Sequence, residues 1–160
     1  MMRRTAFMLA MLLALSVNLY GQGAQKSPSL TMKTLQGRKF NLSDYRGKVV
    51  LLNFWATWCP PCGAEMPDLI KMQREYGSKG LRVIGITYPP QEAAEVRRFI
   101  RKLKVNYPIA LGTQETKALF SQTEVLPLTV VIDRQGNVRE LIEGILLPQE
   151  FEQKIKPLLH

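Results

Sequence analysis

The most informative segment of this chain reads Val49-Val50-Leu51-Leu52-Asn53-Phe54-Trp55-Ala56-Thr57-Trp58-Cys59-Pro60-Pro61-Cys62. Its first seven residues are apolar or aromatic apart from one asparagine, and such a run without alternation is typical of a central strand covered on both faces. Apolar residues at helical spacing follow the second cysteine, and Gly77 ends this pattern. We therefore expect a buried strand over 49–55, then a cysteine pair at the turn, then a helix to about residue 76.

The rest of the chain alternates between strand and helix patterns around this segment. Upstream, residues 30–35 and 39–42 flank a turn at Gln36-Gly37-Arg38 and predict a hairpin, followed by a capped turn over 41–45. Downstream, we expect a strand over 81–87, a helix over 92–103, an extended piece near 109, a short helix over 115–120, strands over 128–133 and 138–143, and a last helix opened by Pro148. This order predicts an α/β sandwich with a mixed sheet.

The scarcity of cysteine and histidine limits the chemistry. The chain has 160 residues, of which two are cysteine and one is histidine, and the histidine is the last residue, His160. Two cysteines exclude a disulfide-dense scaffold and a four-thiolate zinc site. A terminal histidine is poorly placed to act as a preorganised base or ligand. We therefore expect no metal, and any reactive centre must use Cys59 and Cys62.

The formal charge of +9 suggests an anionic partner, but the charges are scattered. The densest basic run, over 97–104, shares its segment with Val96, Phe99, Ile100 and Leu103, which form one apolar stripe at helical spacing. The basic side chains are then the solvated face of an amphipathic helix. We expect no nucleic-acid partner.

The N-terminus indicates export. Residues 1–23 combine two arginines, an uncharged apolar stretch from Thr5 to Val17 and a following run of small residues, which is typical of a secretory signal. The apolar stretch is short for a membrane span, so cleavage is favoured over retention as an anchor. We expect a signal segment over 1–23, a single domain over 24–160, and a location in the periplasm or on the outer face of the cytoplasmic membrane.

The cysteine pair favours redox chemistry over a structural role. A C-x-x-C disulfide closes too small a loop to stabilise a domain of this size. Cys59 stands at the strand-to-helix junction, where the positive end of the helix stabilises a thiolate, and Cys62 lies one turn further in. We therefore expect Cys59 to be the nucleophile and Cys62 to resolve the mixed disulfide. Pro60 and Pro61 have no N–H to donate to the sulfur, which favours a reducing pair.

The segment from Asn53 to Pro67, with Cys59-Pro60-Pro61-Cys62 at its centre, resembles the active-site segment of the TlpA/ResA-like thiol-disulfide reductases, a branch of the thioredoxin fold. The resemblance covers roughly residues 28–159. It implies a thioredoxin-like three-layer sandwich with a mixed central sheet, an N-terminal β-hairpin and a central α/β insertion over 88–111.

The resemblance also implies residue roles. Pro127 matches the family's cis-proline, although the residues alone would predict a trans bond after Leu126. Glu65 matches a buried glutamate that tunes proton transfer, although a glutamate early in a helix is usually solvated. Asn53 stands where thioredoxins proper carry a buried acid. By the same resemblance, the client protein contacts Trp58, Pro60, Pro61, Leu126 and Pro127.

The expected function is an exported monomeric reductase of protein disulfides with no bound cofactor. The resemblance implies recharging by a membrane thiol-electron donor of the DsbD or CcdA type, and clients such as apocytochromes c or copper-site assembly proteins. Two alternatives remain open: the same fold working as an oxidant or isomerase, or a non-catalytic metallochaperone that holds copper(I). A peroxidase is disfavoured because Ala56 stands where the peroxiredoxin pattern has threonine.

Overall fold

The computed structural model describes residues 25–160, so the predicted signal segment over 1–23 lies outside the described residues. The described part contains a six-stranded mixed sheet in the order β1-β8-β7-β4-β5-β6. Its strands are β1 (Gln25–Lys26), β4 (Val49–Trp55), β5 (Leu81–Thr87), β6 (Ile109–Leu111), β7 (Leu128–Ile132) and β8 (Asn137–Glu143). The parallel strands β4, β5 and β6 meet the antiparallel strands β7, β8 and β1 at the β4–β7 pair. The predicted mixed α/β sandwich is confirmed.

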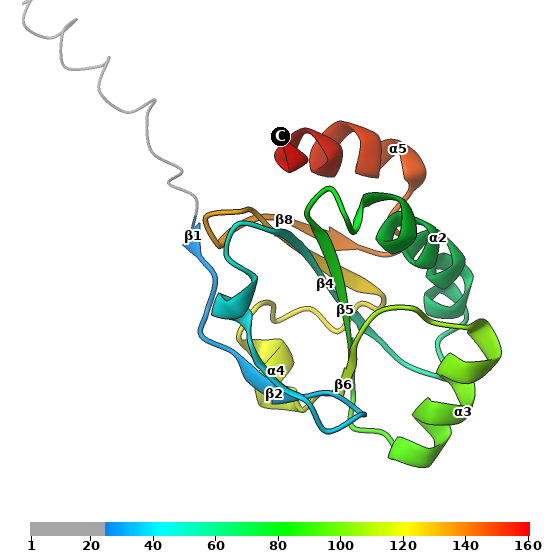
Figure 1. Ribbon diagram of the computed structural model, residues 1–160. Coiled ribbons are helices and arrows are strands. Elements are labelled where there is room, and N and C mark those ends of the chain that lie inside the picture. The colour runs from blue at the N-terminus through cyan, green and yellow to red at the C-terminus, as the bar shows by residue number, and fades with distance from the viewer. Residues whose placement is uncertain (1–24) are drawn as a thin grey trace, which may run out of the picture.

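Strand β4 forms the centre of the core, as its apolar run predicts. All seven of its residues are buried, because neighbouring strands cover both edges and other elements cover both faces. On one face pack α2 (Pro60–Tyr76), α3 (Ala93–Leu103) and the C-terminal segment. On the other face pack the hairpin of β2 (Thr31–Lys33) and β3 (Lys39–Asn41), together with η1 (Leu42–Tyr45). Figure 1 shows α2 and α3 on the opposite side of the sheet from β2 and α4 (Gln114–Ala118).

The hairpin and the insertion lie where the sequence predicts them. The hairpin turn contains Gly37 at φ +80°, a conformation that glycine adopts without steric cost. Within the insertion, α3 buries Val96 and exposes Arg97, Arg98, Arg101 and Lys102, so the basic run is the solvated face of a helix. Strand β6 then adds to the sheet in parallel beside β5.

The C-terminal segment is less regular than the single helix predicted from Pro148 onward. It consists of the short helix α5 (Pro148–Glu150), the π-helical turn η2 (Phe151–Ile155) and the 3-10 turn η3 (Lys156–Leu159). Pro157 explains part of this, since it cannot donate to the helical ladder, and Lys156 N–H donates to Phe151 O in the wider π pattern. The apolar spacing of this segment predicts that Phe151, Ile155 and Leu158 lie on one face. Phe151 and Ile155 are buried as predicted, whereas the third buried residue is Leu159 and Leu158 is only half-buried against the core.

Candidate active site

The two cysteines form a disulfide at the N-terminus of α2. Cys59 is the N-cap of the helix, and Pro60 and Pro61 follow as its first two residues. Cys59 Sγ accepts a hydrogen bond of 3.3 Å from the N–H of Cys62. The cysteines differ in access, since Cys59 is 5% exposed and Cys62 is fully buried. Of the two cysteines, only Cys59 keeps some solvent exposure, and it lies at the end of the helix where the dipole favours a thiolate.

Glu65 lies one helical turn beyond Cys62 and is 1% exposed. Its Oε1 accepts from Asn53 Nδ2 at 2.6 Å, and its Oε2 accepts from the N–H of Leu146 at 3.0 Å. Burial raises the pKa of Glu65 to about 7, against the opposing effect of these two donors. The solvated position usual for a glutamate early in a helix is therefore wrong here, and the buried position that the resemblance implies is what the structure shows.

Asn53 is the one polar residue of β4, and its side chain is fully buried. Besides its bond to Glu65, its Nδ2 donates to Thr129 Oγ1 at 3.0 Å, whereas its Oδ1 has no partner. The residue thus links β4, β7 and α2 below the cysteine pair. Its position on a buried strand is visible in the sequence, but its partners are not.

The two tryptophans near the disulfide have opposite surroundings. Trp55 is buried and stacks on Phe99 with ring centroids 5.5 Å apart, whereas Trp58 is 63% exposed. Trp58 borders a cavity of about 380 Å³ that Glu92 and Glu95 of the α3 N-terminus also line. An exposed aromatic ring beside Cys59 is a surface on which a polypeptide can pack.

Strand pairing places Pro127 at the same end of the sheet as the segment that carries the cysteines. Because β7 is antiparallel to β4 and Leu128 pairs with Phe54, the residues that precede β7 lie beside those that follow β4. The Leu126–Pro127 bond is cis, as the resemblance implies and as the residues alone do not. Pro127 is buried and Leu126 half-buried, whereas Pro60 and Pro61 are exposed. The strand register thus places Leu126 and Pro127 at the end of the sheet from which the segment with Trp58, Pro60 and Pro61 continues.

The loop after β5 adds residues that sequence reasoning missed, because its sequence predicts only a connection. Its Tyr88–Pro89 bond is also cis. Gln91 Oε1 accepts from both the N–H and the Oγ1 of Thr57, at 2.8 Å each, so this loop is tied to the segment that carries the cysteines. The Pro-Pro pair at 89–90 is the signal in the sequence that marks this loop as rigid.

Within residues 25–160, which the structure describes, no helix is long and apolar enough to cross a membrane. The same residues contain no group of three histidine, cysteine or acidic side chains that could hold a metal ion.

A buried strand, a C-x-x-C disulfide at the following helix N-terminus and a neighbouring cis-proline define the class of thioredoxin-fold thiol-disulfide oxidoreductases. The chain belongs to the AhpC/TSA family, whose pattern matches residues 24–141.

Individual relatives agree with this class. The thioredoxin-like protein YneN of Bacillus subtilis (strain 168) is 38% identical over 136 residues, which are 84% of this chain and 79% of that protein. A thiol-disulfide oxidoreductase ResA of Bacillus cereus is 34% identical over 140 residues, 85% of this chain and 80% of that protein. A crystal structure of a thioredoxin-family thiol:disulfide interchange protein from Chlorobium tepidum TLS superposes with a TM-score of 0.80 at 29% identity, covering 88% of this chain and all of the other. The resemblance to ResA-like proteins, the thioredoxin-like fold and the oxidoreductase activity are confirmed.

Proposed function

We propose that this oxidoreductase works as a reductant of disulfides in client proteins outside the cytoplasm. The observation that carries the proposal is the asymmetry of the pair, because Cys59 is the N-cap and keeps slight exposure, whereas Cys62 lies inside the helix and is fully buried. In the reduced protein, the Cys59 thiolate attacks a client disulfide and releases one client thiolate. Cys62 then attacks Cys59 Sγ, which releases the second client thiol and restores the Cys59–Cys62 disulfide, so two electrons pass to the client.

The direction of electron flow is supported by the donors around Cys59. An N-cap side chain accepts from the N–H of the second or third helical residue. Here the second residue is Pro61, which has no N–H, and the third is Cys62, whose N–H lies 3.3 Å from the sulfur. With one of two donors missing, the thiolate is less stabilised and the dithiol gives up electrons more readily.

Glu65 is proposed to handle the proton of the buried cysteine. Cys62 must lose a proton before it can attack, and it has no access to water. Glu65 follows Cys62 by one turn on the same side of α2, and its pKa of about 7 lets it exchange a proton near neutral pH. Its bonds to Asn53 and Leu146 hold the carboxyl in place.

The client is proposed to lie across Trp58, Pro60, Pro61, Leu126 and Pro127, which surround Cys59. Because no further group is needed for thiol exchange, we propose that the protein acts as a monomer without a bound cofactor. The signal-like residues 1–23 support export to the periplasm or to the outer face of the cytoplasmic membrane. There, a membrane thiol-electron donor of the DsbD or CcdA type would recharge the pair, and apocytochromes c or copper-site assembly proteins would be its clients.

The test is to trap the client as a mixed disulfide. A Cys62→Ser variant lacks the resolving thiol, so client proteins should stay covalently attached to Cys59 and separate on reduction. The matched control is the variant with both cysteines replaced by serine, which should trap nothing. If the Cys62→Ser variant forms no adduct in cells, or if adducts persist in the double variant, the proposed mechanism is contradicted.

A further inference from the structure

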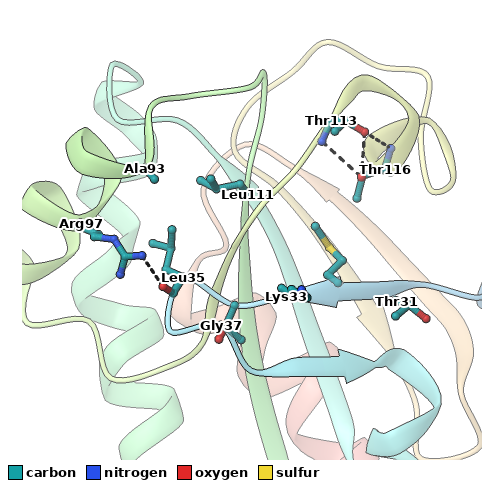
Figure 2. A pocket seen from close by; sticks show the side chains of 11 residues that line it. Thr31, Lys33, Leu35, Gly37, Ala93, Arg97, Leu111, Thr113 and Thr116 are labelled. Atoms are coloured by element: carbon teal, nitrogen blue, oxygen red, sulfur yellow. Dashed lines mark hydrogen bonds between the residues drawn. The ribbon is translucent and has the colours of Figure 1, made fainter.

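A second cavity, of about 520 Å³, opens at the β6 edge of the sheet, between β2 and the segment from Leu111 to Thr116 (Figure 2). The hairpin pairs with β6 through an isolated β-bridge between Thr34 and Ala110. The cavity opens beside this bridge, between the hairpin and the residues that follow β6. Its size is in the range of ligand pockets. It also lies at the carboxyl ends of the parallel strands, where open α/β sheets bind their ligands.

The lining of this cavity, all within the described residues, includes Lys33 and Arg97 but no aspartate or glutamate. Arg97 reaches the cavity from α3, and its Nη2 donates to Leu35 O at 2.5 Å, which fixes the guanidinium (Figure 2). Leu35 and Leu111 supply an apolar wall. We call this feature the basic cavity. Its positive charge, beside apolar surface and with no acidic side chain in the lining, favours an anionic partner.

Lys33 has no role in the hairpin that would explain its charge. It pairs across the hairpin with Lys39, and like charges in directly opposite positions destabilise a strand pair. The positive charge at the rim of the basic cavity is therefore kept at some cost to the hairpin itself.

The cavity beside Trp58 has the opposite charge. Glu92 and Glu95 line it, and no lysine or arginine is among its lining residues in the described chain. Both cavities border the first turns of α3, which supplies Ala93 and Arg97 to the basic cavity. The cavity with Glu92 and Glu95 includes Trp58, which directly precedes Cys59, whereas the basic cavity includes Leu111 at the end of β6. An acidic side chain of a client is therefore repelled close to Cys59 and attracted farther away.

We propose that the basic cavity docks an acidic segment of the client polypeptide whose disulfide is being attacked at Cys59. This inference rests on the proposed function. Trp55, Thr87 and Leu111 are in register on three adjacent strands, so Leu111 lies about 10 Å from the strand end that leads to the cysteines. An extended polypeptide advances about 3.3 Å per residue, so about three residues span the distance from Trp55 to Leu111. We therefore place the acidic residues about three to five positions from the client cysteine, which allows for the segment from Trp55 to Cys59.

The test uses two synthetic peptides, each with one cysteine activated as a mixed disulfide with thionitrobenzoate. One carries two aspartates about four positions from the cysteine, and the other carries asparagines at the same places. The reduced protein should release thionitrobenzoate from the aspartate peptide with a kcat/KM about threefold to tenfold higher at low salt. This advantage should shrink as salt is added, because the charges are exposed to solvent.

The variant Lys33→Gln/Arg97→Gln should lose the advantage. The matched control Lys39→Gln/Arg98→Gln removes the same charge from neighbouring exposed positions that do not line the basic cavity, and it should retain the advantage. If the double variant fails to fold, Lys33→Gln alone leaves the Arg97 bond to Leu35 intact and should lose part of the advantage.

The outcomes separate this inference from the proposed function. All variants should reduce the neutral hydroxyethyl disulfide at the wild-type rate. Equal rates of the wild-type protein on the two peptides, or an advantage that survives in the Lys33/Arg97 variant, would overturn the docking of an acidic segment alone. A wild-type protein that cannot reduce hydroxyethyl disulfide would overturn the proposed function and this inference with it.

Discussion

At the scale of single residues, folding changes the acid–base chemistry of Glu65. An exposed glutamate is ionised at neutral pH, whereas burial raises the pKa of Glu65 to about 7. The donors on both of its oxygens, from Asn53 and Leu146, fix its position without cancelling the effect of burial. The result is a titratable carboxyl group inside the core, one helical turn beyond the buried Cys62.

A Glu65→Gln substitution should remove a pH dependence of stability. The pKa of Glu65 rises from 4.5 to about 7 on folding, so its contribution is fully present below pH 4.5 and is lost as the pH rises through 7. The loss amounts to roughly 3 kcal/mol by pH 8. Glutamine resembles the protonated acid, and Asn53 can turn its unpartnered Oδ1 toward the new amide. Urea unfolding of the oxidised proteins between pH 5 and pH 8 measures the difference.

The matched control for this substitution is Glu75→Gln, which changes an exposed glutamate on the same helix. Its stability profile should run parallel to that of the wild-type protein. If the profile of Glu65→Gln also runs parallel to that of the wild-type protein, burial does not raise the pKa of Glu65, and the proposed proton exchange near neutral pH is contradicted.

The sequence predicts the burial of some of these residues but not their contacts with distant segments. The exposure of Trp58 and the burial of Trp55 follow from their places after and within a central strand. The burial of Glu65 is implied by the resemblance, and its i+3 spacing from Cys62 on an apolar face is a signal that supports it. Its partner Leu146 lies 81 positions away in the chain, and no local pattern connects the two.

At the scale of elements, the contact between β5, β6 and Trp55 leaves no room for a side chain on Gly85. A Cβ atom there would lie 2.5 Å from Ile109 Cδ1 and 2.9 Å from Trp55 Nε1. The isoleucine end can move, but the indole ring is held by its stack on Phe99. Because residue 85 of β5 has no side chain, the indole ring of Trp55 has room to stack on Phe99 of α3.

Gly85→Ala should destabilise the protein by about 1–3 kcal/mol, because overpacking forces neighbours out of their rotamers. Gly63→Ala is the matched control, since its Cβ would meet Phe99 Cζ at an ordinary 3.6 Å and alanine favours a helix. That variant should be about 0.5–1 kcal/mol more stable than the wild-type protein. Chemical denaturation of the oxidised proteins gives both values, and equal stabilities for the two variants would contradict this packing.

Helices and strands are predictable from the sequence where the spacing of apolar residues is regular over a long local segment. The buried strand over 49–55 and the helices α2 and α3 follow from apolar spacing and from clear ends. The expectation of one regular helix in the C-terminal segment is wrong, because apolar spacing reports which face is buried and not the hydrogen-bond pattern. The pairing of β1 with β8 is not predicted, since two residues carry no periodic signal.

At the scale of the whole molecule, topology assembles the site from distant segments. Strand β4 ends at Trp55, shortly before the cysteines, and the antiparallel strand β7 begins after Pro127 beside it. The parallel strands β5 and β6 end at the same end of the sheet as β4, and both the cavity beside Trp58 and the basic cavity are lined by residues that follow or end these strands. Composition suggests only a net positive charge, whereas the fold separates negative from positive surface at this end of the sheet. Strand order cannot be derived from residue patterns, so this arrangement required the structure or a resemblance.

The reduction potential of the Cys59–Cys62 pair tests the central claim most directly. It is measured by bringing the protein to equilibrium with defined ratios of reduced and oxidised glutathione and counting the fraction of dithiol. A reductant with one helical donor to Cys59 should have a potential near about −270 mV. A potential near about −120 mV would make the protein an oxidant and contradict the proposed function.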